Sequence, residues 1–143
     1  MIRKMTSEDV EQVAEIERQS FHRPWSVNAL LKECGNESAL FLVDEEDGTV
    51  IGYMGMYLMI DEADVTNIAY LPEWRNKGRG QILLKQAMQI TTEQGYPNMT
   101  LEVRAGNAAA IHVYQKLGFV SEGIRKNFYD SPKEDANIMW YRP

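Results

Sequence analysis

Cysteine and histidine are scarce in this chain of 143 residues, which contains one cysteine, Cys34, and two histidines. A single cysteine cannot form an intramolecular disulfide, and it is typical of a protein that works in a reducing compartment. His22, His112 and Cys34 are dispersed along the chain, so the spacing of a metal-ligand motif is missing. We therefore expect neither a disulfide framework nor a metal site.

Long apolar runs and an excess of basic charge are also missing. No apolar run approaches the roughly 18 residues that indicate a membrane span, and no cationic segment followed by an apolar one opens the chain. The formal net charge is −6, whereas nucleic-acid binders usually carry a basic surface. We expect a cytoplasmic protein with no membrane or nucleic-acid partner, and the negative charge favours a basic polypeptide or another amine-bearing partner.

The chain contains no repeat, low-complexity tract or linker rich in proline and serine. Its length is that of one domain by the usual prior of about 100 to 200 residues, and its 44% hydrophobic content suffices for one core. We predict a single domain over residues 1–143.

Turn residues and hydrophobic periodicity predict the elements of this domain. A capping-box pattern at residues 6–9 predicts a helix to about Ser20, and Asp47-Gly48 predicts a hairpin turn. The acidic stretch 61–64 is expected to be a solvated turn. The expected strands are residues 2–5, 39–44, 49–60, 65–70, 119–128 and 138–141, with one more around Glu102; the other expected helices are 27–34, 80–94 and 108–117. The pattern indicates an α+β (mixed α/β) fold whose first half is antiparallel.

Residues 101–119, LEVRAGNAAAIHVYQKLGF, join a carboxylate on a predicted strand to a phenol on a predicted helix. Glu102 and Arg104 alternate with apolar residues and therefore project from one face of the strand. Asn107 is a good N-cap, and Tyr114, two turns later, returns to nearly the same helix face. A carboxylate that takes a proton and a phenol that gives one suit general acid/base chemistry.

The second motif is RNKGRG at residues 75–80, between an apolar strand and an amphipathic helix. Glycines let consecutive backbone N–H groups turn toward one point, and a helix N-terminus adds the positive end of its dipole. The three basic side chains add charge, so the sequence predicts a phosphate or pyrophosphate site. No Lys-Ser/Thr pair follows the second glycine, and Leu83 replaces the third glycine of a dinucleotide fingerprint, which argues against nucleoside triphosphate and nicotinamide binding.

Each of these residues also has a plainer structural explanation. A lone glutamate on a strand is most often a surface carboxylate, a tyrosine on an amphipathic helix is often a core residue, and Asn107 serves as a cap whether or not it binds a ligand. His22 and His112 lack the partners of a catalytic triad, and nothing near Cys34 in the sequence would lower its pKa strongly. The combination of Glu102, Asn107 and Tyr114 nevertheless favours the functional interpretation.

Together the motifs resemble those of the GNAT N-acetyltransferase family, whose Arg/Gln-x-x-Gly-x-Gly/Ala pattern corresponds to residues 75–80. More narrowly, residues 67–72, 101–107 and 110–119 resemble the bacterial ribosomal-protein-alanine N-acetyltransferases and their archaeal and eukaryotic N-terminal acetyltransferase relatives. The similarity runs from Ile2 to about Trp140. It implies a central, mostly antiparallel mixed sheet with helices on both faces and acetyl-CoA as cosubstrate.

The resemblance also implies roles for individual residues. Glu102 would be the general base and Tyr114 the general acid. Acetyl-CoA would be held by Asn107, by the backbone of Ile68, Ala69 and Tyr70, and by the phosphate loop, whose expected contacts are Arg75, Asn76, Lys77, Gly78, Arg79, Gly80 and Gln81. The pair Asn76-Lys77 departs from the commoner Gln/Arg-Arg, which changes phosphate affinity in detail but leaves the backbone cradle.

The implied acceptor is the N-terminal α-amine of a protein, with a small-subunit ribosomal protein as the natural target. Arg23-Pro24-Trp25 and Tyr129 resemble positions that flank the peptide entrance in this family and are candidate substrate contacts. Two alternatives stay open. An acetyltransferase for a small amine or a lysine side chain would keep the same cofactor residues, and a noncatalytic acyl-CoA-binding regulatory module would keep RNKGRG without needing Glu102 and Tyr114 together.

Overall fold

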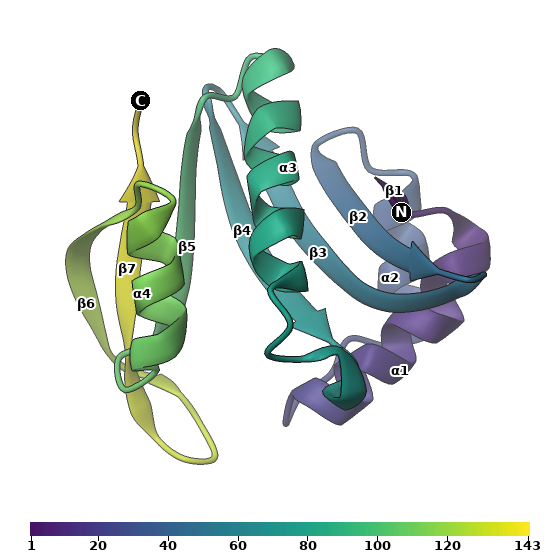
Figure 1. The fold of residues 1–143 in the computed structure, drawn as a ribbon, viewed down its shortest axis with the longest axis horizontal. Helices are drawn as coiled ribbons and strands as arrows, with labels where there is room; N and C mark the ends of the chain where they lie inside the picture. Colours follow the sequence, from purple (N-terminus) through teal and green to yellow (C-terminus); the bar gives the residue numbers. More distant parts are fainter.

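The computed structural model describes residues 1–143, which fold around one seven-stranded sheet (Figure 1). The strands are β1 (Ile2–Lys4), β2 (Ala39–Glu46), β3 (Thr49–Met59), β4 (Glu62–Tyr70), β5 (Asn98–Arg104), β6 (Val120–Tyr129) and β7 (Glu134–Tyr141). The helices are α1 (Val10–Ser20), α2 (Val27–Cys34), α3 (Arg79–Glu93) and α4 (Ala108–Lys116), with short 3₁₀ turns η1 (Ser7–Asp9) and η2 (Pro72–Trp74).

The strand order is β1-β2-β3-β4-β5-β7-β6, and only the β4–β5 pair is parallel. This confirms the predicted mixed, mostly antiparallel sheet. None of the helices combines the length and apolar character needed to cross a membrane.

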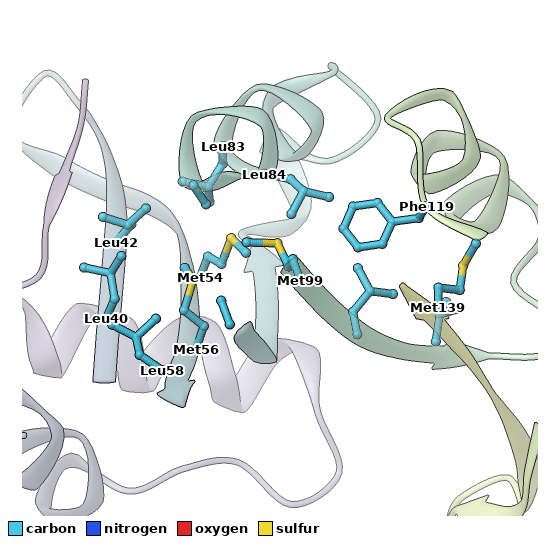
Figure 2. Close-up of a cluster of buried hydrophobic side chains, with 14 of the residues drawn as sticks. Leu40, Leu42, Met54, Met56, Leu58, Leu83, Leu84, Met99, Phe119 and Met139 are labelled. Carbon is cyan, nitrogen blue, oxygen red and sulfur yellow. The ribbon is translucent and has the colours of Figure 1, made fainter. Parts of the chain in front are cut away.

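Helices cover both faces of the sheet, with α1 and α2 on one face and α3 and α4 on the other (Figure 1). On the α3 side, Met54 of β3 packs with Leu83 and Leu84 in the larger core cluster (Figure 2). On the α1 side, Tyr53 of β3 joins Ile16 in a second cluster. Because alternate residues of β3 enter opposite clusters, the centre of the sheet is buried on both faces.

Two predicted turns had different outcomes. Asp47 and Gly48 form the predicted hairpin turn, with φ of 51° and 82°. The prediction of a solvated turn over residues 61–64 is wrong, because β4 already begins at Glu62 and pairs with Met59 across a turn of only two residues. Ala63 is fully buried in the core, which draws this acidic stretch into the sheet.

The last strand also begins earlier than predicted, at Glu134 rather than Ile138. Its polar first half does not resemble a buried strand in the sequence. Ala136 and Asn137 are nevertheless buried, and Ala136 pairs with Arg104 at the end of β5. The extra residues therefore extend the sheet beside the strand that carries Glu102.

Strands β4 and β5 form a fork. They pair only at Glu62–Asp64 with Asn98–Thr100 and then separate (Figure 1). Immediately beyond the last pair, a bulge at Thr66 adds one residue to β4 relative to β3. A bulge bends its strand and increases the local twist, and bulges are common beside active sites. The free edge of β4 beyond the bulge becomes one wall of the candidate site.

Candidate functional site

A cavity of about 480 Å³ opens between the free edge of β4 and the N-terminal ends of α3 and α4. Its lining includes all the predicted cofactor residues except Lys77, together with the predicted acid Tyr114: Ile68, Ala69, Tyr70, Arg75, Asn76, Gly78, Arg79, Gly80, Gln81 and Asn107. The structure therefore brings together residues that lie up to 46 positions apart in the sequence, 68 to 114. Phe21 also lines the cavity, and no pattern in the sequence indicated it.

The loop before α3 presents unpaired backbone N–H groups. Gly78 is the N-cap residue, with φ of 77°, a left-handed conformation that favours glycine. It offers no side chain to cap the helix, and the first backbone bond of the helix is donated by Ile82 to the Gly78 carbonyl. The N–H groups of Arg79, Gly80 and Gln81 are therefore open to an anion at the positive end of the helix dipole.

The side chains of this loop divide into anchors and one free cation. The Arg75 guanidinium donates to the Tyr70 carbonyl at 2.9 Å, and Arg79 donates to Asp44 at 3.0 and 3.1 Å. Lys77 has no ion pair and lies over the Trp74 ring at 5.6 Å. Arg75 and Arg79 thus anchor the loop. The backbone N–H groups are left to meet an anion in the cavity, and Lys77 lies outside the cavity lining.

Asp44 is the buried partner that anchors the start of α3 to β2. Its carboxylate, 2% exposed, accepts from Arg79 and from the Tyr70 phenol at 2.8 Å. Burial by itself would raise the pKa of Asp44, but the hydrogen bonds from Arg79 and Tyr70 outweigh burial and hold the pKa below its usual value. The native state is therefore stabilised by the charged form of Asp44.

We predict that Asp44→Asn lowers the free energy of unfolding at pH 7 by about 1.5 to 3 kcal/mol, the usual worth of a hydrogen bond to a charged group. Because the native pKa is depressed, this stabilisation is complete above the unfolded-state pKa near 4 and is lost as the pH falls further. Urea unfolding at pH 7 and at several lower pH values measures both effects. Glu46→Gln removes a more exposed partner of Arg79 and should cost less. A deficit for Asp44→Asn that persists unchanged to pH 2 would contradict the assignment.

The edge of β4 supplies a row of backbone groups to the cavity. The N–H of Leu71 donates to the Ile51 carbonyl, so these two residues form a hydrogen-bonded pair. Hydrogen-bonded pairs alternate with non-hydrogen-bonded pairs along an antiparallel ladder. The backbone N–H and C=O of Ala69, two residues earlier, therefore point toward Tyr53 in β3. The groups of Ile68 and Tyr70 then face the cavity side. Since Arg75 occupies the Tyr70 carbonyl, the free groups are the N–H and C=O of Ile68 and the N–H of Tyr70. Ala69 lines the cavity, but its backbone N–H and C=O are used in pairing with β3.

Tyr114 lies on the cavity wall with a free phenol. Its ring packs against Phe119 at a centroid distance of 6.0 Å, and no protein group hydrogen-bonds its oxygen. Burial raises the pKa of Tyr114 above the usual value near 10, so the phenol stays protonated at neutral pH and is able to donate. Asn107 caps α4 as predicted, because its Oδ1 accepts from the N–H of Ala110 at 3.2 Å.

Glu102 projects from the sheet face predicted from the sequence. Its neighbours Leu101 and Val103 are buried in the core, whereas the Glu102 side chain is partly exposed. Its Oε2 atom is buried without a hydrogen-bond partner, and the closest cation is Arg125 of β6, whose Nη1 lies 3.5 Å from it. The carboxylate thus makes one long ion pair and no hydrogen bond, which leaves it with capacity to accept a proton.

Two residues near Glu102 were not identified from the sequence, Asp64 and Arg125. Burial, reinforced by the Glu102 carboxylate, raises the pKa of Asp64. The same two causes raise the pKa of Tyr129 to about 12, which places this candidate substrate contact close to the predicted base. Arg104, on the same strand face as Glu102, donates to the carbonyls of Asp130 and Pro132 and so holds the β6–β7 loop beside it.

Comparison with known proteins identifies the family of the chain. The model of the acetyltransferase (GNAT) family matches residues 10–119. A Bacillus subtilis protein, provisionally named as a ribosomal protein bS18-alanine N-acetyltransferase, is 41% identical over 140 residues, covering 97% of this chain and 93% of the relative. The ribosomal protein bS18-alanine N-acetyltransferase of Haemophilus influenzae is 37% identical over 134 residues, covering 92% of this chain and 90% of the relative.

Solved structures give the same result. The crystal structure of the Escherichia coli ribosomal-protein-alanine N-acetyltransferase superposes with a TM-score of 0.91 at 31% identity, covering 99% of this chain and 92% of that one. The PaiA N-acetyltransferase of Thermoplasma acidophilum, solved in complex with coenzyme A, superposes with a TM-score of 0.82 at 25% identity, covering 100% of this chain and 98% of that one.

Proposed function

This chain belongs to the GNAT acetyltransferase family, and we propose that it transfers the acetyl group of acetyl-CoA to the N-terminal α-amine of a ribosomal protein. The observation that carries the proposal is the one cavity that joins the open N-terminus of α3, a free strand edge and the phenol of Tyr114. The names of the relatives supply the acceptor class, because both similar bacterial proteins are described as acting on an alanine of ribosomal protein bS18.

The cavity fits acetyl-CoA in its two chemically distinct parts. The open N–H groups of residues 79–81 suit the pyrophosphate. The free carbonyl of Ile68 and the free N–H of Tyr70 suit the amide-bearing pantetheine arm, which would lie along β4 like an added strand. Asn107, on the opposite wall, is the remaining polar contact. Bound in this way, acetyl-CoA supplies the activated thioester beside Ile68, on the free edge of β4 just beyond the point where β4 and β5 separate.

The protein groups then have separate tasks in a direct transfer. Glu102, directly or through a water, takes the proton of the attacking amine; its carboxylate makes one long ion pair with Arg125 and no hydrogen bond that would hold it away from this task. Tyr114, kept protonated by burial, gives its proton to the departing thiolate. The free N–H of Ile68 polarises the thioester carbonyl, which is an oxyanion-type contribution.

An acceptor experiment tests this proposal. A short peptide that begins with alanine and also contains lysine should be acetylated on its α-amine and left largely unmodified on lysine. At pH 7 about a tenth of an α-amine with pKa near 8 is neutral, against less than about a thousandth of a lysine side chain with pKa near 10.4. This difference gives a bias of about two orders of magnitude before any contact is made.

Fragment mass spectra of the product locate the acetyl group. The matched control is the same peptide with a blocked N-terminus, which should accept almost no acetyl. Transfer chiefly to lysine, or efficient acetylation of a small polyamine with none of any free N-terminus, would replace this proposal with a small-amine or lysine acetyltransferase. Binding of acetyl-CoA without transfer to any amine would instead indicate a noncatalytic acyl-CoA-binding module.

A further inference from the structure

Glu17, near the C-terminal end of α1, is a fully buried carboxylate that the acid/base mechanism does not use. Its Oε1 accepts from the backbone N–H of Trp25 at 2.8 Å, and its Oε2 accepts from Asn67 at 3.1 Å and from the Tyr53 phenol. Burial raises the pKa of Glu17, and the three hydrogen bonds act in the opposite direction. A buried carboxylate is costly unless each of its oxygens is satisfied, as here.

Tyr53 is a core residue of β3, but the other two donors belong to two parts of the site. Asn67 lies on β4, one residue after the bulge and one residue before Ile68, whose free N–H faces the cavity. Trp25 lies in the segment 21–26 between α1 and α2, which we name the acceptor loop. Glu17 therefore connects this loop directly to the part of β4 where the acetyl group is expected.

The acceptor loop lies at the mouth of the cavity. Phe21, its first residue, lines the cavity and is 39% exposed. Arg23 forms an exposed ion pair with Asp130 of the β6–β7 loop at 3.1 Å, so the two loops meet across the opening. These two loops would flank the path of a peptide to Glu102. The position of the acceptor loop relative to β4 thus determines where the amine stops relative to the thioester.

We propose that Glu17 is a positioning residue for the acceptor, which fixes the loop 21–26 against β4 and so aligns the peptide N-terminus with the acetyl group. This inference rests on the proposed function, because it assumes a peptide acceptor. It assigns to Glu17 a role in acceptor binding that is separate from binding of the cofactor's phosphates, since its three bonds reach neither the phosphate loop nor α3.

The test compares two substitutions that differ mainly in hydrogen bonding. Glu17→Met fills a similar space but accepts no strong hydrogen bond, so it leaves the Trp25 N–H unpaired. We expect kcat/KM for the peptide to fall by about 10- to 100-fold, chiefly through KM, as for other small misplacements of a substrate. The Kd for acetyl-CoA, measured by calorimetry, should stay within about twofold of wild type. Glu17→Gln still offers an oxygen to Trp25 and should restore most of the peptide KM.

A control on the same helix separates positioning from stability. The Gln12 side chain accepts from the Val50 N–H at 2.9 Å and so also ties α1 to the sheet, but it does not touch the acceptor loop. Gln12→Ala should lower the melting temperature without changing the peptide KM. Saturating acetyl-CoA stabilises the native state during the assay. If Glu17→Met still fails to fold, Glu17→Asp is the second variant. It keeps the charge but moves it back by one methylene, and we expect the same rise in peptide KM.

The outcomes are distinguishable. A folded Glu17→Met or Glu17→Asp variant with an unchanged peptide KM, or with equal losses in peptide and acetyl-CoA binding, would overturn the positioning role alone. Wild-type enzyme that acetylates no peptide N-terminus would overturn the proposed function and this inference with it.

Discussion

Replacing Glu102 by glutamine should lower the turnover number at neutral pH by about 10²- to 10⁴-fold, the usual contribution of a general base. The change keeps the size of the side chain and removes its ability to take the amine proton. The affinity for acetyl-CoA should change little, because the cavity that holds the predicted cofactor contacts is lined by β4, the loop before α3 and α4, and not by β5. Steady-state kinetics with an alanine-initiated peptide, together with calorimetric titration of acetyl-CoA, measure the two quantities separately.

The pH dependence of the variant gives a sharper criterion than its rate. The loss in Glu102→Gln should shrink as the pH rises past about 8, since the α-amine is then already neutral and needs no base. Tyr114→Phe should show a comparable loss of turnover. Tyr141→Phe makes the same chemical change in a residue that packs on Phe119 but does not line the cavity, and should leave turnover unchanged. Wild-type rates from Glu102→Gln at pH 7 would remove Glu102 from the role of base.

Local rules predicted the elements that carry the site. Alternation around Glu102 placed its side chain on the correct strand face, and Asn107 caps α4 with the hydrogen bond expected of an N-cap. The glycines before α3 predicted an open helix N-terminus, and the structure has one at Gly78. These features depend on residues within one or two turns of each other, which is the range over which sequence patterns are informative.

The remaining features depend on contacts between distant segments. The fork between β4 and β5 opens beside a bulge at Thr66, which no turn residue in the sequence indicates. The basic side chains of Arg75 and Arg79 suggested anion binding, yet both donate hydrogen bonds to oxygen atoms of the protein. The carboxylates that bind Arg79 belong to residues more than thirty positions earlier in the chain. Glu17 lies on the apolar face of α1, and no neighbouring residue in the sequence indicates that three hydrogen-bond donors converge on it.

Gly80→Glu should abolish measurable acetyl-CoA binding while leaving the protein folded. A Cβ atom added at residue 80 would meet only the Tyr70 ring, at 3.8 Å, which is ordinary van der Waals contact. The backbone there does not require glycine for its conformation, since Gly78 and not Gly80 has the positive φ. The folded protein therefore tolerates a side chain at this position. Any loss of acetyl-CoA binding would come from interference between the new side chain and the ligand.

The expected loss has a steric part and an electrostatic part. The side chain would occupy the space from which the N–H groups of residues 79–81 approach a pyrophosphate, and its carboxylate would face that anion. Like charges in contact cost several kcal/mol, which corresponds to a loss of at least about 100-fold in affinity. Gly80→Gln introduces the steric part without the charge, so it should bind acetyl-CoA more tightly than Gly80→Glu. High salt should reduce the difference in affinity between the two variants and leave the steric loss unchanged.

Calorimetric titration of acetyl-CoA against these variants decides the assignment of the phosphate loop. Gly35→Glu is the matched control, because residue 35 also has open space for a side chain but lies after α2, outside the cavity. It introduces the same charge and should leave affinity unchanged, which separates a local effect from one of net charge. If Gly80→Glu binds acetyl-CoA like wild type, the pyrophosphate does not lie on the N-terminus of α3. The anchoring of Arg75 and Arg79 would then need an explanation other than the positioning of an anion site.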